Sequence, residues 1–487
     1  MSGRRSRRPN VVVFVADDLG WGDLSSYGAE KISTPNLDAL ARRGVRFVDC
    51  HASSAVCTPS RYSLMTGLYP WRSPLQSGVL GGVDPSILSY GQETLGTLFS
   101  KAGYNTGAFG KWHLGMGWKR LTGERRSAFD NEFEPDLEGD GKDIDYHAPI
   151  VDGPLEHGFH RYFGIAGSLD MPPYCFIDQD RTVGVPDQEK EPLVTSQRNG
   201  YQVEGWKDDE VDTTVADVAA RWIRDAALED VPFFAYVASA APHRPCVPPS
   251  FIRGSSTAGA RGDSVQLVDW MVGELVETLS ESAVLDHTIF VFTSDNGAPT
   301  IFPEDGDVRE HRPNGLWRGQ KGDAWEGGHR VPLIIAGPGI AAAAECSNVV
   351  SLLDIFPMFR DVLGVGAASV TDGVSLLPAL HKSGGRHECV DNDRVLAQQA
   401  FNGMLSLREG SLKFVFGSGS GGFSSPKGRP GAPQSVFNQL YDLREDPRES
   451  ENLWSFRTRE ADIVLRKFSS RTGLYLRSDG VVGSEVD

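Results

Sequence analysis

Several polar side chains that could carry chemistry stand directly after short apolar runs. They are Asp17 with Asp18, Lys111 with His113, His243, and Asp295 with Asn296. The carboxylates and the amide offer only oxygen ligands, which suit a hard divalent cation such as Ca²⁺ or Mg²⁺ and disfavour zinc. Clustered carboxylates also need such a cation to offset their repulsion. Either acidic pair taken alone fits turn formation or helix capping better, so the pairs have to be considered together.

A thiol joins this set in the run 57–61, which reads Cys-Thr-Pro-Ser-Arg. Thr58 suits a helix N-cap, Pro59 the first helical position and Gly67 the stop, which places Cys57 just ahead of a helix N-terminus. The free N–H groups and the positive dipole end of a helix favour an anion, so an anionic group could react there. On its own the run fits a buried cysteine beside a capped helix equally well.

The apolar runs that precede these groups predict the strands of a parallel sheet. Residues 11–16, 105–109, 233–238, 289–293 and 331–336 are rich in β-branched and aromatic side chains, and amphipathic segments at 35–43, 214–227 and 264–280 lie between them. This alternation is typical of an α/β fold. Because ligands bind outside the carboxyl ends of strands in open α/β sheets, topology alone predicts that the polar groups share one site.

The pattern changes from about residue 385. Residues 395–399, 404–408 and 413–416 predict short antiparallel strands. The stretch 417–433 is rich in glycine, serine and proline and predicts a long flexible loop, after which order resumes at 440–443. We therefore predict a catalytic domain over 1–384 and a smaller C-terminal α+β domain over 385–487.

The amino-acid composition limits the classes of partner that the protein is expected to bind. A chain of 487 residues exceeds one compact core, and 40% apolar with 23% charged residues is ordinary for a globular protein. The net charge of −17 disfavours a nucleic-acid partner and requires local cations around any anionic substrate. No segment has the length of a membrane helix, so we expect no membrane partner.

The first residues and the cysteines predict the cellular compartment of the protein. The first ten residues carry four arginines and predict a solvated tail, because the apolar run 11–16 is too short for an export signal. The cysteines show neither metal-binding nor framework spacing and fit buried thiols of a reducing compartment. They are Cys50, Cys57, Cys175, Cys246, Cys346 and Cys389. We therefore expect a cytoplasmic protein, although a trimmed secreted protein fits the same residues.

The pattern Cys-x-Pro-x-Arg at 57–61 resembles the modification signal of the type I sulfatases, which belong to the alkaline phosphatase superfamily. Companion motifs follow in the order of that arylsulfatase-like family. They lie at 15–23, 110–115, 241–245, 294–297, 319–332 and 440–453. The resemblance covers nearly the whole chain. It implies a large mixed, mainly parallel sheet flanked by helices, and a smaller C-terminal α+β domain with a short antiparallel sheet.

The resemblance also implies a nucleophile and a metal. Cys57 would be oxidised to formylglycine by a formylglycine-generating enzyme, and one hydroxyl of the aldehyde hydrate would attack sulfur. The second hydroxyl would then allow collapse to the aldehyde and expulsion of sulfate, whereas a serine would be left with a stable ester. The implied metal is Ca²⁺, with Mg²⁺ as the alternative. Its ligands would be Asp17, Asp18, Asp295, Asn296 and the modified Cys57.

The remaining implied roles concern the sulfate group. Arg61 would steady the aldehyde hydrate, while Lys111 and Lys321 would hold sulfate oxygens. His113 would assist sulfate release, and His243 would bind sulfate or protonate the departing alkoxide. These roles agree with elementary chemistry, since cations around the sulfuryl oxygens lower the barrier to S–O cleavage and imidazole is a proton donor near neutral pH.

The implied reaction is hydrolysis of an aryl sulfate or a sulfated carbohydrate. One alternative is a phosphate or phosphonate monoester hydrolase of the same superfamily, although two lysines and a single metal favour the monoanionic sulfate ester. The other is a catalytically silent, glycan-binding relative. Candidates for substrate contacts in loops are His311, Arg312, Asn314, Ser168 and Asp170.

Overall fold

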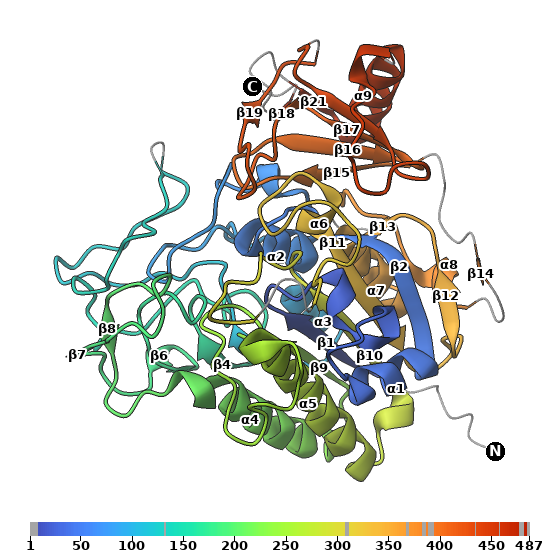
Figure 1. Ribbon diagram of the computed structural model, residues 1–487. Coiled ribbons are helices and arrows are strands. Elements are labelled where there is room, and N and C mark those ends of the chain that lie inside the picture. Colours follow the sequence, from blue (N-terminus) through green and yellow to red (C-terminus); the bar gives the residue numbers. More distant parts are fainter. Residues whose placement is uncertain are drawn as a thin grey trace, which may run out of the picture.

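The fold consists of a large mixed sheet between two layers of helices and a small antiparallel sheet at one end (Figure 1). The computed structural model describes residues 8–130, 133–306, 311–366, 370–381, 386–387, 394–433, 435–456, 458–476 and 482–484. The described α-helices are α1 (Pro35–Arg43), α2 (Cys57–Thr66), α3 (Leu95–Lys101), α4 (Val211–Ala227), α5 (Gly259–Glu281), α6 (Glu326–His329), α7 (Ile355–Leu363), α8 (Leu377–Leu380) and α9 (Thr458–Thr472).

The large sheet has 12 strands among the described residues, and its central strands are parallel. Their order is β14 (Arg386–His387), β12 (Ala344–Cys346), β2 (Gly44–His51), β11 (Arg330–Ala336), β10 (Thr288–Ser294), β1 (Asn10–Ala16), β9 (Phe233–Ala238), β3 (Asn105–Lys111), β4 (Arg161–Ile165), β5 (Ile177–Asp178) and β6 (Arg181–Thr182), with β13 (Val350–Ser351) beside β2. The predicted α/β class and the predicted strands are confirmed.

Strand β1 is apolar at every position from Val11 to Ala16 because it contributes to two cores. Val11, Val13 and Val15 pack into the core on the side of α2, α3 and α7. Val12 and Phe14 pack into the core on the side of α4 and α5. Alternate side chains of a strand point to opposite faces, so a sheet covered on both faces needs a continuous apolar run.

One predicted feature of the sheet is wrong. The run 331–336 was expected to be parallel, but β11 runs antiparallel to both β10 and β2. After β10 the chain stays at the carboxyl edge through the loop that holds Lys321 and through the short helix α6, and it then re-enters the sheet from that edge. Without a long crossover helix to return it to the amino edge, the strand has to run the other way.

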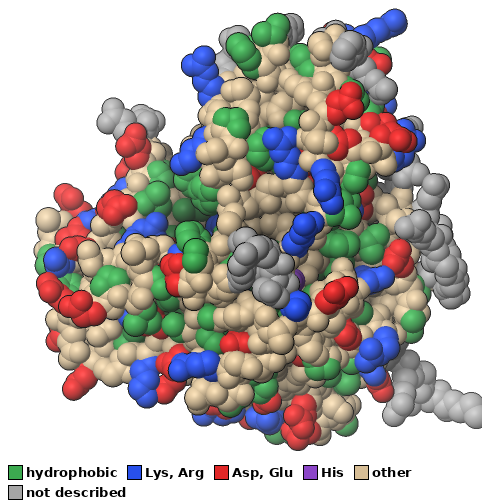
Figure 2. All heavy atoms as spheres, viewed as in Figure 1, with side chains coloured by type: hydrophobic (Ala, Val, Ile, Leu, Met, Phe, Trp, Pro, Cys, Tyr) green, Lys and Arg blue, Asp and Glu red, His purple; other side chains and the backbone are tan. Residues whose placement is uncertain are grey.

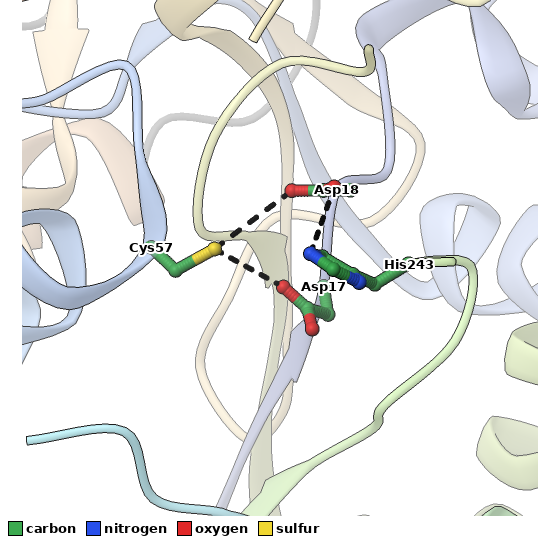
Figure 3. Close-up of side chains that lie close together, drawn as sticks. All are labelled: Asp17, Asp18, Cys57 and His243. Carbon is green, nitrogen blue, oxygen red and sulfur yellow. Dashed lines mark hydrogen bonds and ion pairs between the residues drawn. The ribbon is translucent and has the colours of Figure 1, made fainter. Parts of the chain in front are cut away.

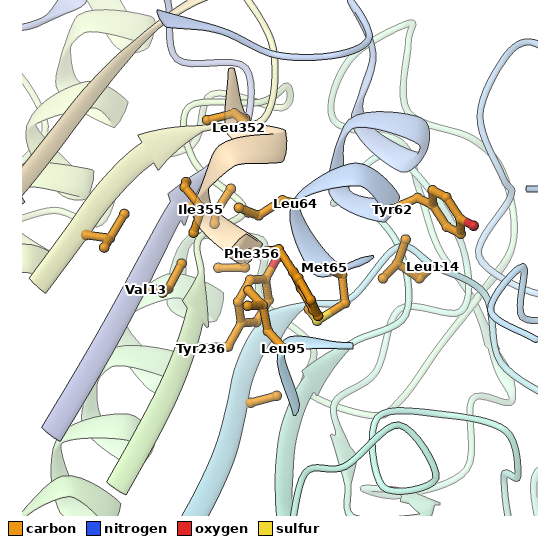
Figure 4. Close-up of a cluster of buried hydrophobic side chains, with 14 of the residues drawn as sticks. Val13, Tyr62, Leu64, Met65, Leu95, Leu114, Tyr236, Leu352, Ile355 and Phe356 are labelled. Carbon is orange, nitrogen blue, oxygen red and sulfur yellow. The ribbon is translucent and has the colours of Figure 1, made fainter. Parts of the chain in front are cut away.

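Helix α2 carries Cys57 and is buried along its whole length. Leu64 and Met65 on α2 pack against Val13 of β1 and Phe356 of α7, as Figure 4 shows. The helix ends at Gly67, whose φ of 70° is the left-handed conformation that favours glycine, as expected. Apolar packing on this scale holds the start of the helix in a fixed position against the sheet.

The start of α2 differs from the prediction. The helix begins at Cys57 rather than after it, and Val56 is the N-cap residue without a side-chain hydrogen bond. The hydroxyl of Thr58 accepts from the backbone N–H of Leu80 instead of capping the helix. Pro59 therefore lies within the first turn, where its missing N–H costs nothing.

The C-terminal part forms the predicted antiparallel sheet. Its strands are β15 (Val395–Gln399), β16 (Leu405–Glu409), β17 (Leu412–Val415) and β20 (Gln439–Asp442). Two further hairpins pair β18 (Gly417–Ser418) with β19 (Arg429–Pro430) and β21 (Leu474–Leu476) with β22 (Val482–Ser484). The predicted boundary between residues 384 and 385 lies outside the described residues, so the division into two domains stays a prediction.

The stretch 417–433, for which the composition predicts a long flexible loop, contains one short strand pair and makes hydrogen bonds to other segments. The β18–β19 hairpin closes it, and the N–H of Phe423 donates to the carboxylate of Asp323, in the loop before α6, over 2.8 Å. Glycine supplies close backbone approaches here, since a Cβ on Gly422 would lie 2.1 Å from the carbonyl oxygen of Gly322. A third two-stranded pairing among the described residues, β7 (Gln188–Glu189) with β8 (Tyr201–Gln202), lies far from this hairpin in the sequence.

The surface shows no single-sign region on the face drawn in Figure 2, where Lys and Arg side chains are interspersed with Asp and Glu. Among the described helices, none combines the length and the apolar composition that a membrane span requires. Five cysteines, Cys50, Cys57, Cys175, Cys246 and Cys346, are buried, and Cys389 lies outside the described residues.

Candidate active site

The polar groups that follow β1, β3, β9 and β10 lie together at the carboxyl edge of the sheet. The strands are neighbours in the order β10, β1, β9, β3, so their ends share this edge. Asp17 and Asp18 follow β1, Lys111 ends β3, and Asp295 follows β10. The connection after β9 brings in His243. The structure thus brings together the strand-end residues that the sequence singled out.

Cys57 enters this group from the first turn of α2. Its Sγ lies 3.5 Å from Asp17 Oδ1 and 3.9 Å from Asp18 Oδ1. Figure 3 shows the sulfur directed at the two carboxylates, with His243 beside Asp18. Burial raises the pKa of the Cys57 thiol well above its ordinary value, although Lys111 and Lys321 oppose the shift. The unmodified thiol is therefore a poor nucleophile at neutral pH.

Two lysines form ion pairs with the two aspartates. Lys111 Nζ lies 2.7 Å from Asp17 Oδ2, and Lys321 Nζ lies 2.8 Å from Asp18 Oδ2. Burial alone would raise the pKa of each aspartate, but Lys111 holds the pKa of Asp17, and Lys321 that of Asp18, below the ordinary value. Both carboxylates are therefore ionised at neutral pH, and the two lysine side chains lie beside the thiol position.

Arg61 binds the acidic residue on the far side of this cluster. From one turn along α2, its Nε lies 2.9 Å and its Nη2 2.8 Å from Asp295 Oδ2, and its Nη2 lies 3.6 Å from Asp17 Oδ1. Its Nη1 donates to the carbonyl oxygen of Lys111. Arg61 thus fixes the start of α2 relative to two strand ends.

The acidic cluster has the donor set of a site for a hard cation. Asp17, Asp18 and Asp295 supply carboxylates, and the amide of Asn296 donates to Asp18 Oδ1 over 2.8 Å. The Asn296 Oδ1 atom is buried and has no hydrogen-bond partner. A buried carbonyl oxygen without a partner beside three carboxylates fits a cation ligand, so these residues are suited to Ca²⁺ or Mg²⁺.

The two histidines differ in their surroundings. His243 Nδ1 lies 2.7 Å from the carbonyl oxygen of Arg244, which is a hydrogen bond donated by Nδ1, and its Nε2 lies 3.6 Å from Asp18 Oδ2. Nε2 therefore faces the site. His113 donates from Nε2 to the carbonyl oxygen of Leu80, and its Nδ1 is buried without a partner. Burial and then Lys111 hold the pKa of His113 well below its ordinary value, so its ring is neutral.

Two of the five substrate candidates lie at the cavity above this cluster. Ser168 Oγ accepts from Lys111 Nζ over 2.5 Å. Asp170 pairs with Arg198 at 2.7 Å, and its other oxygen lies 3.9 Å from His243 Nδ1. Both line a cavity of about 650 Å³ whose floor includes Cys57.

The other three candidates are not among the described residues that line this cavity. His311 contacts Asp23 at 2.7 Å and is buried beneath the site, where Arg261 pairs with the same carboxylate. Asn314 makes two hydrogen bonds with the backbone of Ala298, the residue whose carbonyl accepts from the N–H of Lys321. Arg312 is exposed. A substrate role for these three stays a prediction, whereas their contacts place His311 and Asn314 as supports.

The wall of the cavity was not predicted from the sequence. Arg198, Arg244 and Phe302 line it, and so do Phe401 and Phe423 from the C-terminal part of the chain. Arg244 stands next to His243 in one of the companion motifs and could have been found there. The two phenylalanines have no local signal, because they reach the site only through packing between distant segments.

An oxygen-rich cluster suited to a metal ion, two lysines and a buried thiol at the carboxyl edge of an alkaline-phosphatase-like sheet fit a hydrolase of anionic esters. The sulfatase family model matches residues 9–365, and the chain belongs to the sulfatase family. The protein is accordingly a sulfuric ester hydrolase.

Relatives support this membership along nearly the whole chain. The chain is 32% identical to an N-acetylgalactosamine-6-O-sulfatase of Bacteroides thetaiotaomicron, over 93% of this chain and 91% of that protein. It is also 32% identical to arylsulfatase A of Bos taurus, over 91% of this chain and 83% of that protein. A solved structure from work on glycosaminoglycan metabolism by Bacteroides thetaiotaomicron superposes with a TM-score of 0.79 at 28% identity, covering 96% of this chain and 100% of that chain.

Proposed function

We propose that the protein hydrolyses the sulfate ester of an aryl alcohol or a carbohydrate with formylglycine, formed from Cys57, as its nucleophile. The observation that carries the proposal is the position of Cys57 at the first turn of α2, against two carboxylates and between two buried lysines. Its un-ionised thiol is a poor nucleophile, whereas the hydrate of an aldehyde at the same atom supplies a hydroxyl that can attack and a second that permits release of sulfate.

The lysines and Arg61 then have distinct tasks. Lys111 and Lys321 hold the sulfuryl oxygens, where negative charge gathers during S–O cleavage. Arg61 positions the first turn of α2 by its bonds to Asp295 and to the carbonyl of Lys111. The lysines are buried and pre-oriented, so little reorganisation is needed as charge develops.

The histidines would handle protons. His243 has its Nδ1 proton fixed on the carbonyl of Arg244, which leaves Nε2 facing the site as the atom that delivers a proton to the departing alkoxide. His113 is neutral, and its unpartnered Nδ1 can accept a proton when sulfate is released.

We propose Asp17, Asp18, Asp295, Asn296 and the modified Cys57 as ligands of Ca²⁺, with Mg²⁺ as the alternative. The bound cation would neutralise the carboxylates and polarise the sulfuryl group. With the carboxylates so occupied, Lys111 and Lys321 become available to the substrate. Maturation by a formylglycine-generating enzyme and a cytoplasmic location stay predictions from the sequence.

The test compares three esters that share the leaving group 4-nitrophenol and differ in the acid group. Turnover of 4-nitrophenyl sulfate, 4-nitrophenyl phosphate and 4-nitrophenyl phenylphosphonate should show the highest kcat/KM for the sulfate, since two monovalent ammonium groups and one cation match a monoanion. Cys57→Ala should lose all three activities. A preference for the phosphate or phosphonate would favour the phosphorus ester hydrolase, and absence of turnover with converted Cys57 would favour a silent relative.

A further inference from the structure

The cavity above the sulfate position has an apolar character that the sulfate chemistry does not require. It encloses about 650 Å³, within the range of sites for small organic ligands. Cys57, His113, His243 and Lys321 form its floor. Eight of the sixteen other lining residues are apolar, and Phe302, Phe401 and Phe423 are the largest of them. The part of the substrate that leaves with the oxygen has to face this wall.

Phe401 and Phe423 form an aromatic pair within that wall. Their ring centroids lie 5.0 Å apart with the planes tilted by 51°. Phe423 is 39% exposed although it lines a concave surface, so part of its ring remains free for a ligand. Large aromatic rings left open in a pocket contribute apolar contact area at low entropic cost.

The aromatic pair is attached to the segment that carries Lys321. The N–H of Phe401 donates to the carbonyl oxygen of Gly322 over 2.9 Å, and the N–H of Phe423 donates to the carboxylate of Asp323. A Cβ on Gly322 would lie 3.0 Å from the Phe423 ring, so the ring is in close contact with the residue next to Lys321. These contacts hold the rings at a set position relative to the ammonium group that holds the sulfate.

The arginines of the same cavity are already neutralised. Arg198 pairs with Asp170 at 2.7 Å. Arg244 pairs with Glu304 at 2.5 Å and with Asp305 at 2.6 Å. Among the described lining residues, this leaves no arginine without a carboxylate partner for a second anionic group on the substrate, and desolvating an unpaired anion is costly.

We infer that the leaving group is a single uncharged ring whose flat apolar face packs on Phe401 and Phe423. The inference rests on the proposed placement of sulfate and names the substrate class for that site. A sulfated phenol and a sulfated neutral sugar share this chemistry, because both present an apolar ring face beside the ester oxygen. A polysulfated or uronate-bearing chain does not.

The test uses Phe401→Ala and Phe423→Ala in the matured, metal-loaded enzyme, with Phe423→Tyr as the variant that keeps the ring. Substrates are 4-nitrophenyl sulfate, N-acetylgalactosamine 6-sulfate and the ring-free butyl sulfate. Each alanine variant should lower kcat/KM for a ring substrate roughly 3- to 10-fold, the scale of one aromatic contact. Butyl sulfate turnover and inhibition by inorganic sulfate should stay within about twofold of wild type. Phe423→Tyr should retain the ring preference.

The control is Phe251→Ala, which removes an exposed ring that packs on Trp270 away from the cavity. Equal losses on butyl sulfate and on the ring substrates would overturn the inference, because the rings would then only support Lys321. No loss on either ring substrate would overturn it as well. Loss confined to the phenol or to the sugar identifies which of the two uses the rings. A change in sulfate inhibition alone would count against the proposed sulfate placement instead.

A second arm tests the charge of the ring. Sulfated 4-hydroxybenzoate and its methyl ester differ by one carboxylate. The ester should have the higher kcat/KM by at least about tenfold, since the described lining residues have no spare arginine for the carboxylate. A preference for the free carboxylate would overturn the inference.

Discussion

Recognition of the negative charge of the substrate depends on Lys111 and Lys321. They reach the site from different elements, one from the end of β3 and one from the loop before α6, and each is paired with its own aspartate. Burial lowers and the neighbouring Asp18 raises the pKa of Lys321, with the result well above the ordinary value. On a protein of net charge −17, these fixed local cations have to attract the sulfate.

Replacing either lysine by alanine should lower kcat/KM by roughly 10² or more, which is the scale of losing one preorganised charge at a developing anion. The measurement is steady-state hydrolysis of 4-nitrophenyl sulfate with the metal content checked. Lys207→Ala is the matched control, because that lysine is 61% exposed and pairs with Glu210 on the surface. Near-wild-type kinetics for a Lys111 or Lys321 variant would place that lysine outside the reaction.

Helix α2 holds the residues of the 57–61 motif in fixed positions. Its first residue is the reactive cysteine, its second turn holds Arg61 against Asp295, and its end at Gly67 packs against α7. A Cβ on Gly67 would lie 2.9 Å from the Cβ of Phe356. The helix therefore has little freedom to shift along its axis.

Gly67→Ala should destabilise the protein for two reasons. Alanine disfavours the left-handed backbone conformation at this position, and its Cβ would be crowded by Phe356. Gly364 ends α7 with a similar φ of 65°, but a Cβ added there would have no atom within 4 Å. Gly364→Ala should thus cost about 1–2 kcal/mol from backbone conformation alone. Gly67→Ala should cost at least about 1 kcal/mol more, from overpacking. Urea denaturation measures both, and equal losses would show that the end of α2 is not tightly packed.

The elements that could be predicted from sequence are those whose signals are local. Helix α1 was predicted with its observed bounds, and the ends of β1 and β10 were correct to within one residue, because apolar runs and caps are read from neighbouring residues. The direction of β11 could not be read in this way, because it depends on the edge at which the chain re-enters the sheet. The role of Thr58 depends on Leu80, 22 residues away.

The same distinction applies to the site. Strand-end residues were predicted to meet because parallel strands end at one edge. The wall was missed because Phe423 is positioned by Asp323, 100 residues earlier in the chain. His311 and Asn314 were predicted to contact substrate because they lie in a loop. Their polar atoms instead form hydrogen bonds with Asp23 and with the backbone of Ala298.

Buried charged side chains connect the small C-terminal sheet with the segment that leads into the large sheet. Lys413 on β17 is fully buried, with its Nζ 3.1 Å from Glu326 Oε1, 3.3 Å from Glu449 Oε1 and 2.9 Å from His329 Nε2. Glu326 and His329 belong to α6, which leads from the Lys321 loop into β11. The C-terminal sheet thus supports the segment that carries a sulfate-binding lysine.

Lys413→Met should lower the free energy of unfolding by about 3–5 kcal/mol, because it leaves the buried Glu449 without its cation and takes one cation from Glu326, which keeps Arg330 and Arg408. Lys207→Met, at an exposed ion pair, should change it by no more than about 0.5 kcal/mol. Chemical denaturation followed by tryptophan fluorescence measures both variants. A loss below about 1 kcal/mol for Lys413→Met would mean that the network does not join the two sheets.

The formylglycine mechanism is tested most sharply by the number of product equivalents that Cys57→Ser releases, when it is made in a host that converts only cysteine. Peptide mass spectrometry across Cys57 first establishes that the wild type carries the aldehyde. A serine hydroxyl can accept the sulfuryl group but cannot release it by forming a carbonyl. We predict at most about one equivalent of 4-nitrophenol per enzyme and a sulfated peptide, following the burst behaviour of covalent catalysis. Sustained turnover by Cys57→Ser at the wild-type rate would contradict the formylglycine mechanism.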